Sequence, residues 1–302
     1  MTARYLTAVY LAKLPYAPHR AHLRISPREH VNFWWSYFPG TVDPDGASIC
    51  DYSGPDLGYL RFLWKFLQPG MTFFDVGAYH GIYALIAAKK LGKYGRVVAF
   101  EPSPDGLRRL RLHLHLNRIS SATAENCAIT AEEGTAPLFT VLDGHPDMNS
   151  LRHSAPDFPV SHTTVATTTL DRYVQYKRIN KVDLVKIDTE GAEMDVFRGA
   201  DRFVHQLRPL IICEVLDQVT RPWGYAAREI VARLQTRDYD WFDIRHDGCL
   251  VPHRLQSEYP EVRNYLAIPR EKRDSLRRVL DPSAAFLDLD SQGERVPLQM
   301  SD

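Results

Sequence analysis

A buried strand, a short turn and a helix follow one another repeatedly from Met71 to about residue 268, and this alternation constrains the fold most. Apolar strand patterns occupy 71–76, 95–101, 122–129, 181–187, 208–215, 239–245 and 262–270. Helical patterns at 81–92, 103–117, 192–200 and 225–235 separate several of them. Strands that alternate with helices predict a doubly wound, mostly parallel α/β sheet with both faces covered.

Local signals set some of the element ends. Ser103 is a predicted N-cap, and Pro104 takes the first helical position. A further helix at 57–68 is stopped by Pro69-Gly70. Between the third and fourth strands lies a digression over 134–174, whose ends are typical of β-hairpin arms and whose middle is a long loop.

The flanking segments lack this pattern. Residues 1–55 form an irregular extension or cap, in which aromatic side chains gather at Phe33, Trp34, Trp35, Tyr37 and Phe38. Such a group extends a core, walls an acceptor site or joins two copies of the chain. We therefore place the main domain at 56–270 and a C-terminal helix and tail at 271–302, and we keep a homo-oligomer through the aromatic segment open.

Composition excludes some classes of partner. The 302 residues hold 37 basic and 37 acidic side chains, which disfavours a non-specific grip on nucleic acid or an anionic membrane. The four cysteines are far apart and fit reduced thiols in a cytoplasmic protein. The apolar run before Lys13 and Pro15 is too short for a membrane span.

The carboxyl ends of the predicted strands carry polar side chains. Because parallel sheets bind ligands beyond these ends, we expect one crevice to collect several of them. They are Asp75, Glu101, Asn126, Asp188 and Glu214.

The turn after the first of these strands, "DVGAYHG", selects among nucleotide ligands. A dinucleotide fingerprint that starts at Gly77 needs glycines at 79 and 82, where the chain has Tyr79 and Ile82. A carboxylate at Asp75 would also repel a pyrophosphate. S-adenosylmethionine, which has an ammonium, a sulfonium and no phosphate, suits the turn better, with its carboxylate on N–H groups of the turn and of the following helix.

Glu101 supports a ligand that contains adenosine. It ends the second strand about 20 residues beyond the turn, the spacing at which an acid takes ribose hydroxyls. The alternative is that Glu101 only complements the dipole of the following helix.

Four segments together carry a family resemblance: "FFDVGAYHGIYA", "VVAFEPSP", "ENCAI" and "VDLVKIDTEGAEMDVFRGA…RPLIICEV". With them the chain resembles the FkbM-type S-adenosylmethionine-dependent methyltransferases, of the class I Rossmann-like fold, from about Leu57 to Ile268. The family turn often contains A-N-x-G, where this chain has "AYHG". The resemblance implies a methionine end near the turn, Glu101 on the ribose, 126–128 near the adenine, and the acids of "KIDTEGAE" by the reacting centre. The expected cofactor-binding residues are Asp75, Gly77, Ala78, Tyr79, Gly81, Glu101, Pro102, Ser103, Asn126, Cys127, Ala128 and Asp188.

Methyl transfer to a hydroxyl or an ammonium needs a base. Asp188 and Glu190 are the first candidates, because neighbouring acids with split pKa values suit such roles; their structural alternative is ordering the turn and capping the helix. His80 is a candidate base or a hydrogen-bonded loop histidine. Lys186, in an apolar strand, should pair with a carboxylate.

The long loop within the digression is a candidate lid. Its expected contacts to an acceptor are His145, Asn149, Arg152 and His153. No ligand spacing there favours a metal, and none is expected.

The sequence therefore predicts a cytoplasmic S-adenosylmethionine-dependent methyltransferase that acts on the hydroxyl of a sugar or small natural product, with an amine acceptor left open. Two alternatives remain: a dinucleotide-dependent oxidoreductase, and a non-catalytic nucleoside-binding module that serves a partner.

Overall fold

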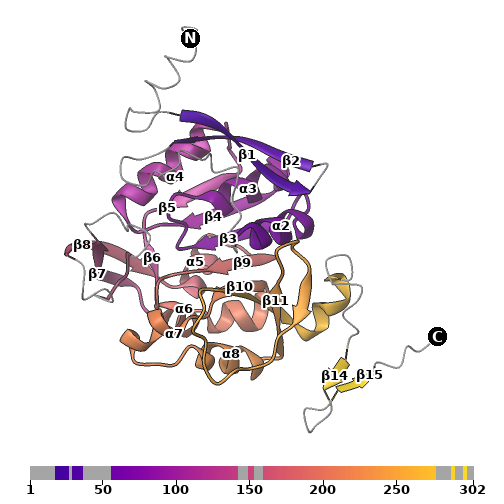
Figure 1. The fold of residues 1–302 in the computed structure, drawn as a ribbon. Helices are drawn as coiled ribbons and strands as arrows, with labels where there is room; N and C mark the ends of the chain where they lie inside the picture. Colours follow the sequence, from indigo (N-terminus) through magenta and orange to yellow (C-terminus); the bar gives the residue numbers. More distant parts are fainter. Residues whose placement is uncertain are drawn as a thin grey trace.

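The computed structural model describes residues 18–26, 29–36, 56–141, 149–152, 159–276, 287–289 and 295–297. Over these residues an eight-stranded sheet runs through the molecule, with helices packed against both of its faces (Figure 1). The predicted α/β class and the mostly parallel sheet are confirmed.

The central sheet has the strand order β12-β11-β13-β10-β9-β3-β4-β5. Its strands are β3 (Thr72–Val76), β4 (Arg96–Phe100), β5 (Ala122–Glu125), β9 (Leu184–Ile187), β10 (Leu210–Glu214), β11 (Tyr239–Ile244), β12 (Leu250–Pro252) and β13 (Asn264–Pro269). The five strands from β10 to β5 pair in parallel, whereas β13 lies antiparallel between β10 and β11. The chain first builds outward from β3 towards β5 and later from β9 towards β10. The order therefore reverses between β3 and β9, where sheets of this kind bind ligands.

Successive side chains of the central strands point into different cores, because a strand has a period of two. Phe73 belongs to one buried cluster and Phe74, its neighbour on β3, to the other. The first cluster includes residues of α2, α3 and α4, and the second includes residues of α5, α6 and α8. The helices are α2 (Asp56–Phe66), α3 (Ile82–Leu91), α4 (Pro104–Leu116), α5 (Leu170–Tyr176), α6 (Glu193–Arg198), α7 (Asp217–Thr220) and α8 (Arg228–Gln235), with shorter turns η2 (Gly92–Tyr94), η4 (Phe203–Leu207) and η5 (Arg221–Trp223).

The predicted cap of α4 is confirmed. The Ser103 hydroxyl accepts a hydrogen bond from the Gly106 N–H at 3.3 Å, and Pro104 opens the helix. Because this cap fixes where α4 begins, it also fixes the distance between the end of β4 and the helix.

The digression between β5 and β9 forms a second, three-stranded sheet of order β6-β8-β7. It contains β6 (Ala128–Ile129), β7 (Gly134–Val141) and β8 (Val160–Thr168), so the predicted hairpin arms are confirmed. The sequence predicted one strand over 122–129. In the structure the chain instead leaves the central sheet after Glu125, and β6 pairs with β8.

The N-terminal segment is not irregular, as the sequence predicted, but contains the antiparallel hairpin β1 (Pro18–Ser26) and β2 (Glu29–Ser36). On β2, Val31, Phe33 and Trp35 are buried within the core formed with α2, α3 and α4, while Trp34 is 38% exposed. The interpretation that these aromatic side chains extend a core therefore holds for Phe33 and Trp35. Tyr37 and Phe38 lie outside the described residues.

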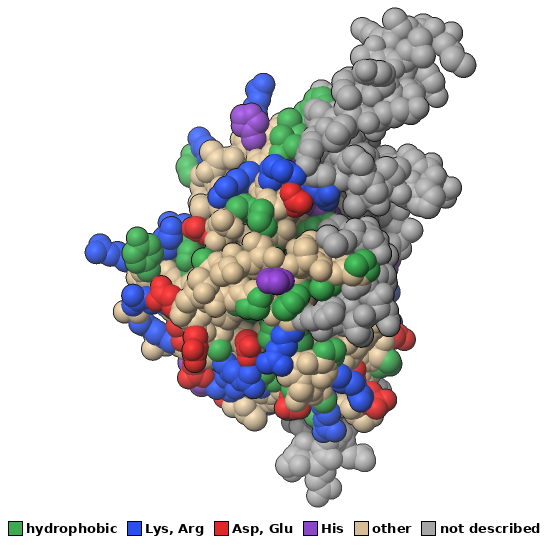
Figure 2. Space-filling model, turned by 90° about the vertical axis from the view of Figure 1, so that its left-hand side faces the viewer, with side chains coloured by type: hydrophobic (Ala, Val, Ile, Leu, Met, Phe, Trp, Pro, Cys, Tyr) green, Lys and Arg blue, Asp and Glu red, His purple; other side chains and the backbone are tan. Residues whose placement is uncertain are grey.

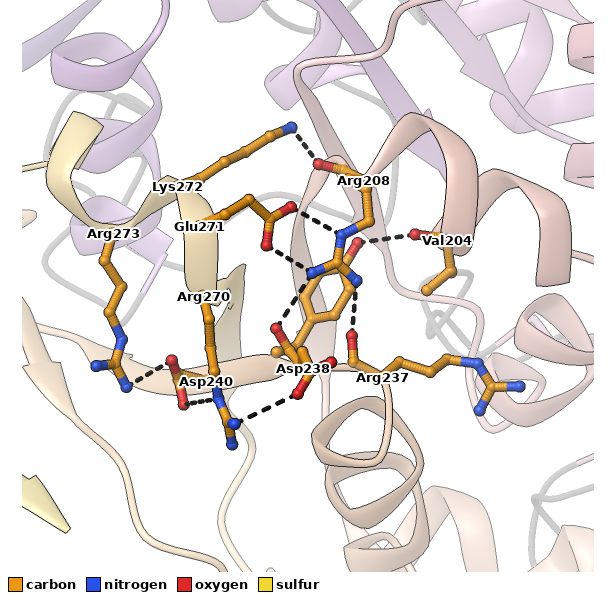
Figure 3. A network of polar contacts seen from close by, with 10 residues as sticks. Val204, Arg208, Arg237, Asp238, Asp240, Arg270, Glu271, Lys272 and Arg273 are labelled. Atoms are coloured by element: carbon orange, nitrogen blue, oxygen red, sulfur yellow. Dashed lines mark hydrogen bonds and ion pairs between the residues drawn. The ribbon is translucent and has the colours of Figure 1, made fainter. Parts of the chain in front are cut away.

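The segment after β13 is fastened to the domain by a network of ion pairs (Figure 3). It forms the 3-10 helix η6 (Arg270–Leu276), where the sequence predicted a short exposed helix. Arg208 holds Glu271 through two bonds of 2.7 and 2.8 Å, and its guanidinium also donates to the Arg237 carbonyl at 2.6 Å. Leu276 is buried in the main core. Residues 271–276 therefore pack with the domain that the sequence ended at 270, and β14 (Leu287–Leu289) pairs with β15 (Arg295–Pro297) beyond them.

Charges of both signs mix over the surface. On the face in Figure 2, lysine and arginine side chains lie among aspartate and glutamate side chains, as the equal numbers of acidic and basic residues lead one to expect. Within the described part of the chain, every helix is too short or too polar to reach across a bilayer.

Candidate functional site

A cavity of about 540 Å³ opens at the carboxyl ends of β3, β4, β9 and β10, where the strand order reverses. Most of the predicted site residues that the structure describes line it: Gly77, Ala78, Tyr79, His80, Glu101, Pro102, Cys127, Ala128, Asn149, Asp188 and Glu190. Five others do not line it: Asp75, Gly81, Ser103, Asn126 and Arg152. His145 and His153 lie outside the described residues. Of the five strand-end side chains expected in one crevice, Glu101, Asp188 and Glu214 line the cavity, whereas Asp75 and Asn126 do not.

The turn after β3 is shaped by Gly77, which has a positive φ of 78°. A Cβ at this position would stand 1.8 Å from the Asp188 carbonyl oxygen, so only glycine lets the turn approach the end of β9. The N–H groups of Gly77 and Ala78 donate to the Phe100 carbonyl at 3.1 and 3.0 Å. Because the protein itself uses these N–H groups, they are not available to a ligand carboxylate, contrary to the simplest expectation for this turn.

Asp75 lies beneath the turn and not against the cavity. Its side chain is fully buried, and its Oδ2 accepts the Ala84 N–H in the first turn of α3 at 3.0 Å. Its Oδ1 has no hydrogen-bond partner among the described residues. Burial raises the pKa of Asp75 to about 6, although nearby Lys186 opposes this shift. Asp75 therefore joins the turn to α3.

His80 is held in place by aromatic rings. The Trp35 ring meets it edge to face at 5.1 Å, and the Tyr79 ring lies 4.1 Å away. Burial lowers the pKa of His80 to about 3, with His113 and Arg109 adding to the effect. Near neutral pH the imidazole is uncharged, and its conjugate acid is too strong for an effective base.

Glu101 faces the cavity from the end of β4. Its Oε2 accepts the Tyr79 N–H at 2.6 Å and its Oε1 accepts the Ser103 N–H at 2.7 Å. A Cβ at Gly106 would press to 2.9 Å from the Glu101 carboxyl carbon, so a glycine in α4 makes room for this acid. Glu101 thus joins the turn to the start of α4 and lines the cavity. The alternative that Glu101 only complements the dipole of α4 does not account for its bond to the turn.

A paired lysine and aspartate lie at the end of β9. Lys186 is buried, and its Nζ donates to Asp188 Oδ2 at 2.8 Å, as the sequence predicted for a lysine in this strand. Glu193 takes the capping role considered for Glu190, because its Oε1 accepts the Thr189 N–H at 2.8 Å. Glu190, with a positive φ of 53°, lines the cavity instead.

The loop of the digression reaches the cavity through its described residues 149–152. The Ser150 hydroxyl donates to the Glu190 carbonyl at 2.8 Å, and Asn149 Oδ1 accepts the Val141 N–H at 3.3 Å. Arg152 instead lies over the Trp223 ring, 4.7 Å from its centre. Of its predicted acceptor contacts, Asn149 therefore lines the cavity and Arg152 does not, while Ser150 joins this loop to the turn after β9.

Several residues that line the cavity have no place at the site predicted from the sequence: Tyr83, Ser150, Leu151 and Asn264. Glu214 lies in the crevice, as its position at a strand end predicts, but the sequence indicates no chemical role for it. Asn264 sits beside it as its register partner on β13. Only the antiparallel insertion of β13 brings the two together, and no local pattern reports that insertion.

The cavity is rich in carboxyl groups. Glu101, Asp188, Glu190 and Glu214 line it, with Lys186 as the lysine among the described lining residues. Because that lysine is already bonded to Asp188, the wall offers little to a pyrophosphate and favours a cationic ligand.

A family model agrees with this arrangement. The methyltransferase FkbM domain model matches residues 75–273, which is more than half of the 302 residues. The chain belongs to the FkbM methyltransferase family. The resemblance that the strand-end motifs carry is thereby confirmed, and the match covers β3 to η6, including every element that lines the cavity.

Relatives of this FkbM-family chain are distant. It is 25% identical to Methyltransferase 1 of Beauveria bassiana over 47% of this chain and 64% of that protein. It is 24% identical to the hexuronic acid methyltransferase AglP of Haloferax volcanii over 51% of this chain and 59% of that one. A solved FkbM methyltransferase from Methylobacillus flagellatus is 15% identical with a TM-score of 0.42, over 67% of this chain and 44% of that one. The chain thus spans less than two thirds of the length of each of these three.

Proposed function

We propose that this FkbM-family chain is a methyltransferase that uses S-adenosylmethionine. The observation that carries the proposal is a cavity at the strand-order reversal whose wall is dominated by carboxyl groups. A volume of about 540 Å³ falls in the range of cofactor sites. The close approach at Gly77 and the room left by Gly106 give the turn and Glu101 the shape that such a ligand needs.

Three parts of the chain would hold the cofactor. Glu101 would accept hydrogen bonds from ribose hydroxyls, while its bonds to Tyr79 and Ser103 keep its carboxyl group in place. Cys127, Ala128 and Pro102, which all line the cavity, would border the adenine. The turn from Gly77 to His80 would lie along the methionine end. Asp75, Gly81, Ser103 and Asn126 would act by supporting these residues, since they do not line the cavity.

In the reaction the acceptor oxygen would gain the methyl group as the carbon–sulfur bond breaks, with the electron pair going to sulfur and the hydroxyl proton to a carboxylate of the chain. Asp188 is the favoured base, because it ends β9 at the cavity and Lys186 fixes its Oδ2. Glu190 lies beside it, where it would orient the acceptor. His80, with a pKa near 3, would shape the wall instead of taking the proton.

The acceptor we propose is a hydroxyl on a sugar or a small natural product. The carboxyl groups of the acceptor side would accept hydrogen bonds from several hydroxyls, and Asn149 adds an amide. The relative AglP acts, by its name, on hexuronic acid, which agrees with a sugar acceptor.

Ligand binding separates this proposal from its first alternative, a dinucleotide-dependent oxidoreductase. S-adenosylhomocysteine at a hundredfold excess over its Kd should stabilise the fold by about 2.7 kcal/mol, or roughly 5–10 °C in Tm. NAD at the same concentration should leave Tm unchanged. Equal shifts with both ligands would count against a methyltransferase. The second alternative, a non-catalytic nucleoside-binding module, predicts the same shift without methyl transfer to any of a panel of sugars.

A further inference from the structure

Three carboxylates meet at the acceptor end of the cavity. Asp188, Glu190 and Glu214 each place an oxygen within 4.8 Å of the other two. Oxygens on opposite sides of a calcium or magnesium ion lie about 4–5 Å apart, because the bonds are about 2.0–2.6 Å long. The three side chains therefore already stand at the spacing of ligands around one hard cation.

An independent feature points to the same place. The Asn264 side chain is only 7% exposed and lines the same cavity, yet its Oδ1 has no hydrogen-bond partner among the described residues. Its register partner Glu214, 5% exposed, likewise has a buried Oε2 without a partner there. Buried polar atoms are normally satisfied, so two unpaired oxygens on neighbouring strands fit a partner that approaches from the cavity, and a cation is one such partner.

The charge of the site and the type of its ligand atoms indicate which metal ions it would bind. Three carboxylates with a single lysine bonded to Asp188 leave an excess of two negative charges if all are ionised. The donors are carboxylate and amide oxygens, with no thiol or imidazole among the three acids and Asn264. This set suits magnesium, manganese or calcium and not zinc or copper.

We propose that one divalent cation of this oxygen-preferring class binds here. Its ligands are the carboxylates of Asp188, Glu190 and Glu214 and the side-chain Oδ1 of Asn264. The sequence predicts no metal, because no ligand spacing along the chain favours one. These ligands come instead from β10, β13 and the turn after β9, and only the strand order brings them together.

The role of the ion rests on the proposed function. A cation held here leaves coordination positions open towards the cavity, because four protein oxygens do not fill a shell of six or more. An acceptor hydroxyl bound at such a position loses its proton more easily, since the metal stabilises the alkoxide. The proton then passes to a carboxylate oxygen of the site that the ion leaves free.

The test uses the full chain, freed of metal by a chelator and then dialysed. Manganese chloride is titrated in with and without saturating S-adenosylhomocysteine, and free Mn²⁺ is followed by electron paramagnetic resonance. We expect stoichiometric binding of a single ion that magnesium displaces. Glu214→Gln and Asp188→Asn should each weaken Mn²⁺ binding by about tenfold or more.

Glu133→Gln is the matched control, because Glu133 is exposed just before β7 and does not line the cavity. It should bind Mn²⁺ like the unaltered chain. If Glu214→Gln fails to fold, the test uses Mn²⁺ binding by Asn264→Ala, which should also be weakened, and the Mn²⁺ stoichiometry of the unaltered chain. Absence of stoichiometric Mn²⁺ binding, or equal binding by Glu133→Gln and Glu214→Gln, would overturn the site. Calorimetry with S-adenosylhomocysteine on the same samples distinguishes the two proposals. If this ligand binds but Mn²⁺ does not, only the metal site is refuted. If Mn²⁺ binds but this ligand does not, only the methyltransferase proposal is refuted.

Discussion

Trp35 lies flat against His113, with ring centres 3.7 Å apart and planes inclined by 14°. His113 in turn donates from Nδ1 to the His80 carbonyl at 2.7 Å. A residue of the N-terminal hairpin therefore contacts the turn that borders the cavity both directly, at the His80 ring, and through His113. The hairpin is also joined to α4 where Asn117 bonds both the N–H and the carbonyl of Trp34, at 2.9 and 2.7 Å.

Trp35→Ala should therefore damage both stability and cofactor binding. Removing a buried tryptophan costs about 3–5 kcal/mol of unfolding free energy. The loosened turn should also weaken S-adenosylhomocysteine binding by about tenfold, or 1.4 kcal/mol. Denaturant unfolding and calorimetry measure the two effects. Trp34→Ala, at an exposed position of the same strand, should change stability by about 0.5 kcal/mol. Similar losses from both variants would refute a specific role for Trp35.

Gly77→Ala should be far more harmful than Gly70→Ala. Both glycines have positive φ, 78° and 89°, so both variants carry the strain of a left-handed residue. At Gly70 an added Cβ meets nothing within 4 Å, whereas at Gly77 it meets backbone at 1.8 Å. We expect about 1–2 kcal/mol of destabilisation for Gly70→Ala and clearly more for Gly77→Ala. The difference in unfolding free energy isolates the close approach between the turn and β9, and equal values would show that the turn shifts freely.

Glu101 should make stability decrease as pH rises. Burial raises its pKa to about 7 against the opposing bonds from Ser103 and Tyr79, while an unfolded glutamate has a pKa of about 4.3. Between these values the folded state holds the proton that the unfolded state has lost. The stability linked to this group is therefore fully present below about pH 4 and is lost as pH rises to about 7.

Glu101→Gln removes this titration, so its unfolding free energy should fall less between about pH 5 and pH 8 than that of the unaltered chain. Denaturant unfolding at several pH values checks this, with exposed Glu133→Gln as the control. Parallel curves for Glu101→Gln and the unaltered chain would mean that Glu101 is already ionised at pH 5. Asp75, with a pKa near 6, adds a slope of the same sign to both chains.

If Asp188 is the general base, Asp188→Asn should lower kcat more than His80→Ala does. Asp188→Asn should lower kcat by about 10²–10⁴-fold, the usual loss of a general base. His80→Ala should lower kcat less, because His80 is already uncharged and weakly basic. Both rates are measured at saturating cofactor, with the cofactor Kd determined separately for each variant. The reverse order, with cofactor binding intact, would assign the base to His80.

Much of the sheet could be predicted because its signals are local. The apolar runs of β3, β4, β9 and β10 and the cap at Ser103 each lie within a few neighbouring residues. The hairpin β1–β2 could not be predicted as easily, because Trp34 and Trp35 are both aromatic. This hides the alternation of buried Val31, Phe33 and Trp35 with exposed neighbours. That alternation was the signal that could have found β2.

The site divides in the same way. The turn, Glu101 and Asp188 belong to contiguous motifs, so their place at the cavity could be predicted. The pairing of Glu214 with Asn264 depends on β13 entering the sheet in the opposite direction. The bond from Ser150 to Glu190 joins residues 40 positions apart along the chain. Neither contact leaves a mark in periodicity or spacing, because both arise from how separate elements pack.

The excursion from Glu125 to β9 also bears on how such enzymes diversify. It leaves the central sheet after β5, builds its own three-stranded layer and touches the acids of the cavity through Ser150. The strands β3, β4 and β9 pair with one another without any strand of this excursion between them. The hairpin β7–β8, which follows Cys127 and Ala128 along the chain, is therefore a natural unit of exchange between relatives: an inherited or engineered graft of it would alter which molecule is chosen for modification and leave the residues proposed to hold the donor in place.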